Sequence, residues 1–446
     1  MLDIKFIREN IEKVKEACQK KQVKVDIDQL IKIDKKRRKE LQLLEEIRAQ
    51  KNKASKLIPN IVDKEGKDKL ISEMKEIDQK GDELEESLKN LNKEYHDLMY
   101  QVPNIPFNDV PVGKDEKSNI VIREVGKKPN LRFKPKDHIL LGESLDIIDT
   151  KRASKVSGAR FNYLKGKLAL LEFALIQYTF EILTSEKIIK KIANSIEKGY
   201  SDNLFIPIVP PVMVRPDVFR KMGRLTDNDK DERYYLEKDD LYLVGSAEHT
   251  LGPIHMDEVL DEKNLPLRYV GFSTSFRREA GSYGKDTRGI LRVHQFDKIE
   301  IESFTTKENS LKEQNFIVAV QEYLVNSLNI PYQVVMISTG DMGMPDARQI
   351  DIECWMPGQD KYRETHTSDL MTDFQARRLK TRIKREYNKI EFAHMNDATV
   401  FAIGRILIAI IENYQQKDGS IKVPKVLQKY VNFESIKQEK NETKID

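Results

Sequence analysis

Cysteine is scarce in this chain, and several common signatures are missing altogether. Only Cys18 and Cys354 occur among 446 residues, which excludes a disulfide framework and any zinc site built from several cysteines. There is no Gly-x-x-x-x-Gly-Lys-Ser/Thr phosphate loop, no Gly-x-Gly-x-x-Gly after a strand-like stretch and no His-Glu-x-x-His pair. The most common nucleotide folds and zinc-protease sites are therefore disfavoured.

Long apolar runs are also missing. None approaches the ~18 residues that a membrane helix needs. The opening Met1–Phe6 alternates charged with apolar residues and so lacks the apolar stretch of a secretory signal. We expect a cytoplasmic protein without membrane contact. The formal net charge of +4 is too small to indicate nucleic acid binding by itself, because that requires basic residues gathered on one face.

The length of the chain predicts more than one domain. At roughly 150 residues per domain, 446 residues favour two units, and the proline-rich stretch Val102–Gly113 marks the boundary. We expect a helical N-terminal domain over residues 1–101, a linker over 102–119, a second domain over 120–432 and a disordered, charged tail over 433–446.

A coiled-coil pattern dominates the first domain. Aliphatic residues recur at 4-3-4-3 spacing from Leu70 to Leu98, and a looser helical stripe runs from Leu30 to Ala54. Pro59-Asn60 and Gly66 are expected to interrupt the helical pattern between these two stretches. This predicts an antiparallel hairpin of two helices of about 30 residues each, ~45 Å long.

The first of these helices is strongly basic. Between residues 35 and 56 it carries nine lysines and arginines against Glu40, Glu45 and Glu46. Such a surplus is typical of a solvated helix face, but it also suits contact with a phosphate backbone. Composition leaves both interpretations open.

The second domain mixes strands with helices. Residues 267–276, 292–304 and 349–357 have strand-like patterns, whereas 165–198 and 402–415 are helical. Strands joined by hairpin-length loops predict an α+β fold with a largely antiparallel sheet.

The stretch Phe276–Glu300 carries the most chemistry. Arg277 and Glu279 open a loop with Gly281, Gly284 and Gly289, and arginine suits the bidentate binding of phosphate. In the strand that follows, Phe296 and Glu300 share one face about 13 Å apart, as a base-stacking ring and a carboxylate for a small substrate would. The combination is typical of a site for ATP beside an amino acid, although a solvated hairpin has similar charges.

Two further positions carry unusual charge. Arg405 lies in the otherwise apolar helix 402–415, so it requires a paired carboxylate or an anionic ligand. Glu364, Thr367 and Asp369 offer oxygen ligands for Mg²⁺. Glu364 and Thr367 are three residues apart and would face oppositely on a regular strand, so a shared metal requires a β-bulge or a strand end.

Taken together, these segments resemble the bacterial type of seryl-tRNA synthetase, a class II aminoacyl-tRNA synthetase. Family blocks are similar to Met1–Arg8, Lys155–Phe161, Ser246–Glu248, Thr339–Gly343 and Asp373–Arg378. Phe276–Glu300 is similar to class II motif 2, Gly404–Gln415 to motif 3, and Pro211 to the motif 1 proline.

The resemblance implies a fold and an activity. The fold is an N-terminal antiparallel coiled-coil arm plus a class II catalytic domain, an antiparallel β-sheet flanked by helices, in a homodimer. The activity is that of a ligase, which would first form seryl-adenylate from L-serine and ATP and release pyrophosphate. It would then transfer the seryl group to the 3′ end of tRNA(Ser). The coiled-coil arm of the protein would bind the long variable arm of this tRNA. Charging of tRNA(Sec) is left open.

The resemblance also assigns residues. Arg277, Glu364 and Arg405 would be catalytic, and Glu364 with Thr367 would bind Mg²⁺, with no zinc expected. The ATP-binding residues would be Arg277, Arg278, Glu279, Val293, Phe296, Glu364, Thr365, His366, Thr367 and Arg405. The serine-binding residues would be Ser246, Ala247, Glu248, Arg277, Glu300 and Thr399.

Some positions depart from the family pattern. Ser246 replaces a threonine, Thr365-His366-Thr367 replaces a frequent Ile-Ser-Ser, and Asp397 replaces an asparagine, while the hydroxyls at 246, 367 and 399 remain. Two other functions compete with the tRNA ligase. A ligase that charges a carrier protein would lack the arm, and a non-catalytic RNA-binding paralogue would be expected to lose Arg277, Glu364 or Arg405.

Overall fold

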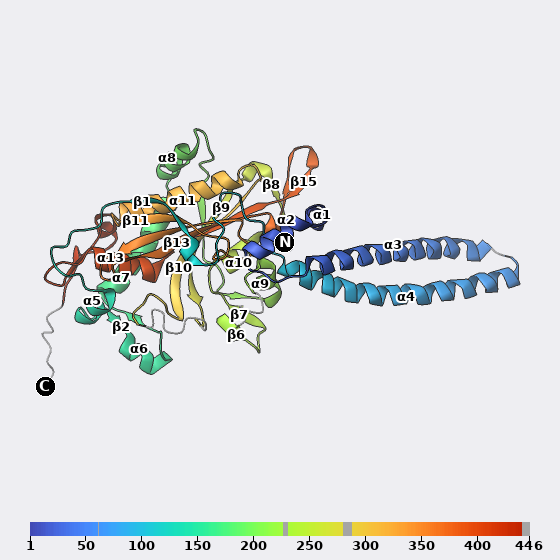
Figure 1. Cartoon of the computed structure of the whole chain (residues 1–446), viewed down its shortest axis with the longest axis horizontal. Coiled ribbons are helices and arrows are strands. Elements are labelled where there is room, and N and C mark those ends of the chain that lie inside the picture. Colours follow the sequence, from blue (N-terminus) through green and yellow to red (C-terminus); the bar gives the residue numbers. More distant parts are fainter. Residues whose placement is uncertain (61, 226–230, 280–287, 439–446) are drawn as a thin grey trace. The chain divides into compact units, whose positions relative to one another are not determined.

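The computed structural model describes residues 1–60, 62–225, 231–279 and 288–438. It forms two compact units, Met1–Pro103 and Asn104–Asp446 (Figure 1). Among the described residues no single helix is long and apolar enough to cross a membrane. The helices α7 (Lys167–Leu183) and α8 (Glu186–Ile196), which meet at a 66° bend, reach the required length and hydropathy only when taken together.

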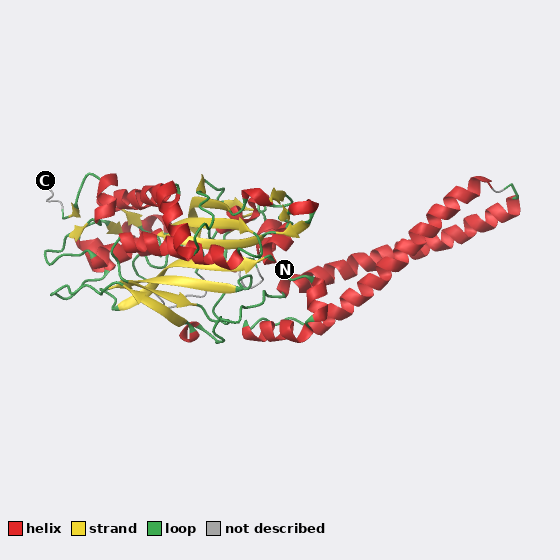
Figure 2. Cartoon of the chain, turned by 90° about the horizontal axis from the view of Figure 1, so that it is seen from above, coloured by secondary structure: helices red, strands yellow, loops and turns green. Residues whose placement is uncertain are grey.

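The first unit is entirely helical. It consists of α1 (Ile4–Glu9), α2 (Ile11–Lys20), α3 (Ile27–Leu57), the 3₁₀ turn η1 (Ile58–Asn60) and α4 (Lys64–Gln101). Helices α3 and α4 run antiparallel as the predicted hairpin (Figures 1 and 2). They have 31 and 38 residues. Each begins after an aspartate N-cap, Asp26 or Asp63, whose side chain accepts hydrogen bonds from backbone N–H groups of the first turn.

One boundary within the hairpin was predicted wrongly. Gly66 does not break the second helix but lies in its first turn, where its N–H donates to the Asp63 carboxylate at 2.8 Å. The predicted seam is buried along the part of the hairpin near its open end, at Leu30, Leu44, Leu88 and Leu91 among others. Burial of these leucines holds the two helices together.

The second unit is built on an eight-stranded sheet, and the three predicted strands are β9, β10 and β12. From edge to edge the strands are β1 (Ile120–Val125), β11 (Tyr332–Met336), β12 (Arg348–Met356), β13 (Lys361–Thr372), β16 (His394–Ala402), β10 (Gln295–Thr305), β9 (Leu267–Phe276) and β4 (Phe205–Ile208). Every pairing is antiparallel except that of β4 with β9. The antiparallel sheet is thereby confirmed.

Helices and small sheets surround this sheet. They are α5 (His138–Ser144), α6 (Thr150–Ser157), α7 (Lys167–Leu183), α8 (Glu186–Ile196), α9 (Pro216–Met222), α10 (Glu248–Leu251), α11 (Ser310–Ser327), α12 (Phe374–Leu379) and α13 (Ile403–Asn413). The short strands are β2 (Ile148–Asp149), β3 (Tyr163–Leu164), β5 (Met213–Val214), β6 (Tyr235–Leu236), β7 (Leu241–Leu243), β8 (Val259–Asp261), β14 (Arg382–Lys384), β15 (Ile390–Phe392), β17 (Ile421–Lys422) and β18 (Ser435–Ile436). The predicted helical stretch 165–198 is two helices, because the chain bends at Thr184–Ser185 between α7 and α8.

The two faces of the sheet differ in character. Helices α11 and α13 both pack against β10, β12, β13 and β16. Their apolar side chains form one core with strand residues such as Ile299, Ile301 and Phe401. Because side chains alternate along a strand, Glu300 and Glu302 point to the opposite face, which is free to carry a polar site.

Both ends of the predicted second domain need adjustment. Part of the predicted linker 102–119 is fastened to the second unit, since the Asn104 side chain donates to the carbonyls of Pro345 and Met371, each at 2.8 Å. The predicted tail begins too early at Phe433, because Ile436 is buried and β18 pairs with β17. The remainder of the tail, from residue 439, lies outside the described residues.

Candidate active site

Two β-bulges shape the polar face of the central strands. In β13 the pairing with β12 skips Thr365, and in β16 the pairing with β10 skips Val400. The first bulge brings Glu364 to the same side as Thr367, whose hydroxyl lies 3.4 Å from the Glu364 carboxylate. Of the two arrangements that a shared metal would require, a β-bulge or a strand end, the structure has the bulge, since a regular strand would have separated these side chains.

Beyond the bulges, the strands line up a row of polar residues. Glu300 of β10 lies opposite Thr399 of β16, which lies opposite Thr367 of β13, which lies opposite Asp351 of β12. Fully buried Gln321 of α11 donates to the carbonyls of Thr367 and Thr399 at 2.9 and 2.8 Å. Helix α11 therefore holds the neighbouring strands β13 and β16 in register at these two threonines.

A cavity opens to solvent beside this row. Its lining includes the predicted site residues Arg277, Glu279, Val293, Phe296, Glu364, Thr399 and Arg405. The cavity combines one aromatic ring, an apolar wall and three arginines, as a planar, anionic ligand requires.

Arg405 contacts Glu364, and the charge of Arg277 also acts on this carboxylate. Arg405 donates to its carboxylate at 3.0 Å and to its backbone carbonyl at 3.2 Å. The Glu364 side chain is 46% exposed, so it is only partly desolvated; that desolvation would raise its pKa, but the charges of Arg405, Arg277 and Lys298 hold it below its usual value. The predicted carboxylate partner of Arg405 therefore exists.

Arg405 itself is less buried than its apolar helix suggested. Its side chain is 25% exposed, because it stands in the first turn of α13 and extends to the cavity. Arg277 is anchored by donation of its Nε to the Gly245 carbonyl at 3.1 Å, and its guanidinium carbon lies 5.3 Å from the centre of the Phe296 ring. Both cations are thus held at the cavity rather than enclosed in the core.

The described ends of the loop between β9 and β10 line the cavity. Arg292 donates to the Glu279 carboxylate at 2.7 Å, which orients that side chain. Gly281 and Gly284 lie outside the described residues. Gly289 has φ of +76°, and a Cβ there would lie 2.1 Å from Nε2 of His138, so only glycine fits.

Glu300 is the most fully engaged carboxylate of the row. One oxygen accepts from the Ser246 hydroxyl and from the backbone N–H of Glu248 at 2.9 Å. The other is paired with Lys298 and accepts from the Thr399 hydroxyl at 3.2 Å. These contacts bring the predicted serine-binding residues Ser246, Glu248, Glu300 and Thr399 together at one point.

Three predicted site residues direct their side chains elsewhere. Arg278 is exposed and stacks 4.8 Å from the centre of the Tyr234 ring. Thr365 and His366 are fully buried and their side chains contact each other at 2.7 Å. Burial lowers the pKa of His366 to about 3, so it stays neutral. We therefore leave these three side chains out of the proposed site.

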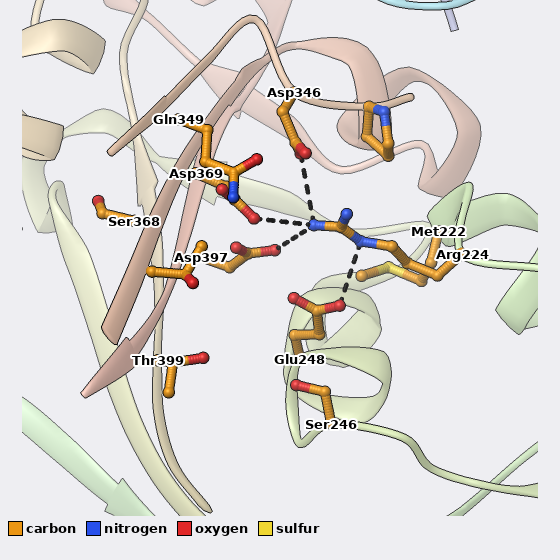
Figure 3. Close-up of polar contacts among 12 residues, drawn as sticks. Met222, Arg224, Ser246, Glu248, Asp346, Gln349, Ser368, Asp369, Asp397 and Thr399 are labelled. Carbon is orange, nitrogen blue, oxygen red and sulfur yellow. Dashed lines mark hydrogen bonds and ion pairs between the residues drawn. The ribbon is translucent and has the colours of Figure 1, made fainter. Parts of the chain in front are cut away.

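A second charged cluster adjoins the Glu300 contacts (Figure 3). Arg224 forms ion pairs with Glu248 at 3.1 Å, Asp346 at 3.4 Å, and Asp369 and Asp397 at 3.2 Å each. We call these five residues the Arg224 cage. Asp369 was predicted to offer an oxygen ligand for Mg²⁺ beside Glu364 and Thr367, but in the structure it forms an ion pair with Arg224.

Separate elements deliver the members of the cage. Gly223, with φ of +75°, ends α9 in a left-handed turn, and Arg224 follows directly. Glu248 begins α10, Asp346 precedes β12, and Asp369 and Asp397 face each other across β13 and β16. Burial and the other carboxylates raise the pKa of Asp397 well above its usual value.

The donor set around Glu364 fits a magnesium ion. Glu364 and the Thr367 hydroxyl present oxygen atoms, and Asp351 and Glu353 of β12 lie opposite these two residues. Burial first and the charge of Glu364 second raise the pKa of Asp351 and of Glu353. This concentration of negative charge would be relieved by a divalent cation with oxygen ligands.

The basic surface of α3 is partly neutralised within the hairpin. Arg48 pairs with Glu85 of α4 at 2.8 Å, Lys51 pairs with Asp78, and Arg38 pairs with Asp34 at 3.0 Å. Lys35, Lys39 and Lys53 are exposed, and we find no ion pair for them within the described part of the chain. These lysines form the remaining basic surface of α3.

Comparison with known proteins identifies the family. Residues 1–106 match the model of the seryl-tRNA synthetase N-terminal domain, and residues 233–414 match that of the tRNA synthetase class II core domain (G, H, P, S and T). A serine–tRNA ligase of Dictyoglomus turgidum is 41% identical over 443 residues, 99% of this chain and 100% of the relative. The chain belongs to the seryl-tRNA synthetase family. A relative from Thermodesulfovibrio yellowstonii is 39% identical over 98% of this chain and 100% of its own length.

Solved seryl-tRNA synthetases have the same fold. The enzyme of Pyrococcus horikoshii, complexed with ATP, has a TM-score of 0.87 at 38% identity and covers 99% of this chain and 100% of its own. The cytoplasmic serine–tRNA ligase of Naegleria fowleri, in complex with AMP, has a TM-score of 0.82 at 31% identity and covers 99% of both chains. The predicted fold class, arm plus antiparallel catalytic sheet, is therefore confirmed.

Several residues of this candidate site could not be found from the sequence. Lys298 was placed on the correct face of its strand, but its contacts with Glu300 and Thr399 were not foreseen. Arg224 and Asp346 carried no motif at all. The one available signal was Asp397, since an acid in place of the family's asparagine adds a buried charge that needs a cation.

Proposed function

We propose that this chain is a serine–tRNA ligase that forms seryl-adenylate from L-serine and ATP and then charges tRNA(Ser). One observation carries the proposal. The Arg277–Glu364–Arg405 cavity and the Glu300 contacts share one sheet face, with Thr399 at the boundary of both. A nucleotide and a hydroxyl amino acid could therefore meet there.

The residues of the chain support this reaction by positioning and by charge. A carboxylate oxygen of serine attacks the α-phosphorus, the bond to the bridging oxygen breaks, and pyrophosphate leaves. Arg277 would bind the α-phosphate and the serine carboxylate, Phe296 would stack on adenine with Glu279 at its amine, and Arg405 would bind the γ-phosphate. No protein nucleophile is needed, since alignment and charge neutralisation lower the barrier.

Glu364 and Thr367 would hold Mg²⁺, which would supply positive charge to the phosphates. On the amino acid side, Glu248, Ser246 and Ala247 would surround the serine ammonium, and Glu300 with Thr399 would bind the hydroxyl. A substrate without that hydroxyl would leave buried polar groups unpaired, which disfavours alanine. In the second step a ribose hydroxyl at the 3′ end of tRNA attacks the carbonyl of the adenylate, and AMP leaves.

One assay tests the proposal. ATP–pyrophosphate exchange should depend on L-serine and be weak with threonine and alanine, with ATP and Mg²⁺ held constant. Charging of tRNA(Ser) with serine should follow, and parallel reactions with tRNA(Sec) decide whether it is also an acceptor. Absence of serine-dependent exchange would refute the function. Exchange without charging of any tRNA would instead favour a ligase that acts on a carrier protein, although the presence of the arm argues against that alternative.

The proposal includes a homodimer. Leu170 and Phe173, three residues apart on one face of α7, are 50% and 65% exposed, and Ile206 on the edge strand β4 is 44% exposed. Exposed apolar groups and an unpaired strand edge are typical of surfaces that associate.

The proposal also includes a cytoplasmic location, which cell fractionation would contradict if the chain sedimented with membranes.

Replacing Phe173 by aspartate should convert the dimer into monomers, because a charge would have to be buried at the interface. Sedimentation velocity measures this directly. The matched control is Leu311→Asp on α11, which is 41% exposed and should leave the dimer intact. A native chain that sediments as a monomer at micromolar concentration would refute the dimer.

A further inference from the structure

The Arg224 cage places a protein cation directly behind the proposed ammonium site. The guanidinium contacts Glu248 on one side and Asp346, Asp369 and Asp397 on the other (Figure 3). Glu248 is linked in turn to the Glu300 contacts through its backbone N–H, which donates to Glu300 at 2.9 Å. The cage and the amino acid pocket therefore share Glu248.

We propose that Arg224 is a positioning residue that holds Glu248 in place and ionised for the substrate ammonium, and that it occupies the cage so that no other cation can. This inference rests on the proposed function, because it assigns a role to Glu248 in binding serine. Arg224 would not touch the substrate but would act through Glu248.

The contacts of Glu248 support this role. The N–H of Gly245 donates to Nδ1 of His249 at 3.1 Å, so the proton of the neutral ring lies on Nε2, which is 3.2 Å from the same Glu248 oxygen that pairs with Arg224. Burial lowers the pKa of His249 to about 4. A neutral donor orients the carboxylate but brings no charge, so Arg224 is the cation in direct contact with it.

The charges around Glu248 explain why such a cation is needed. Glu300 and Glu302 approach from β10, Asp369 from β13 and Asp397 from β16, and Arg233 acts on His249. Burial first and the charge of Glu248 second raise the pKa of Glu302. Burial would raise the pKa of Glu248 as well, but Arg224 and His249 hold it well below its usual value.

Arg224→Ala should therefore weaken serine binding in a pH-dependent way. Loss of an adjacent cation raises the proton affinity of a carboxylate by about 10- to 1000-fold, so as the pH is lowered the KM for serine should rise above the native value and approach this factor. It should move back toward the native value as the pH rises and Glu248 ionises. The KM for ATP should stay within about twofold, since the cage lies outside the nucleotide cavity.

Guanidinium rescue separates this role from a purely structural one. Millimolar guanidinium chloride should lower the KM for serine of Arg224→Ala by entering the vacated cage, whereas urea, its neutral analogue in shape, should not. Arg348→Ala is the matched control, since Arg348 is similarly buried and pairs with Asp109 at 2.8 Å outside the site. It should lower thermal stability without a pH-dependent KM and without rescue.

The outcomes are distinct. If the native chain shows no serine-dependent exchange, the proposed function fails. If the native chain is active and Arg224→Ala has a native KM for serine at every pH, the positioning role fails. If Arg224→Ala does not fold, Arg224→Lys decides, because its single ammonium cannot reach all four carboxylates. A KM raised at low pH supports the proposal, and an unchanged profile overturns it.

Discussion

Replacing Arg277 by alanine should lower kcat/KM for serine-dependent ATP–pyrophosphate exchange by about 10²–10³-fold, the usual cost of removing one fixed donor to a developing charge. Arg277 is held at the cavity by its bond to the Gly245 carbonyl, so it is preorganised. It lies at the boundary between the nucleotide and amino acid sides, and we expect both KM values to rise. Exchange kinetics with ATP and serine varied in turn measure the effect.

Arg278 provides the contrast in the same loop. It has the same side chain one residue away, but it stacks on Tyr234 and does not line the cavity. Arg278→Ala should therefore change kcat/KM several-fold at most, with a similar melting temperature. Equal losses in the two variants would show that the loop responds to charge in general, and the specific role of Arg277 would be refuted.

Deleting residues 28–100 should leave serine-dependent exchange largely intact while abolishing the charging of tRNA(Ser). The reason is that the cavity and the Glu300 contacts lie entirely in the second compact unit, whereas the hairpin lies in the first. Exchange and aminoacylation measured on one preparation compare the two steps directly. An undiminished charging rate would refute the role of the arm.

A smaller change tests which charges of the arm act. Neutralising Lys35, Lys39 and Lys53 to glutamine should weaken tRNA binding and reduce the slope of log affinity against log salt by about three, or about one per lysine that contacts a phosphate. Three exposed body lysines, Lys187, Lys191 and Lys198, give a control with the same change of charge. If both triple variants bind alike, the basic surface of α3 is only a solvated face.

The hairpin and the strands could be predicted from the sequence because they depend on local periodicity. The apolar seam repeats along each helix, and strands alternate apolar with polar residues. The strand face that carries Phe296 and Glu300 could therefore be predicted from the sequence. A β-bulge or a strand end at Glu364–Thr367 could also be anticipated as the condition for a shared metal, since two oxygen ligands three residues apart cannot share a side of a regular strand, and the structure has the bulge.

The direction in which individual side chains point was harder to predict from the sequence. Arg278 and Arg277 look equivalent in the sequence, and only the packing of Tyr234 and Gly245 separates them. Arg405 appeared to be a buried cation because its helix is apolar, but its place in the first turn of α13 leaves it at the cavity.

By itself, the sequence determined the family resemblance, the two-helix arm, the antiparallel body and the need of Arg405 for an anionic partner, because motif spacing and periodicity are local properties. Only the tertiary structure decided the Arg224 cage and the contacts of Lys298. Residues 224, 248, 346, 369 and 397 come from five separate segments. The ionisation of Glu248 depends on burial and on charges delivered by the whole fold, which no local pattern encodes.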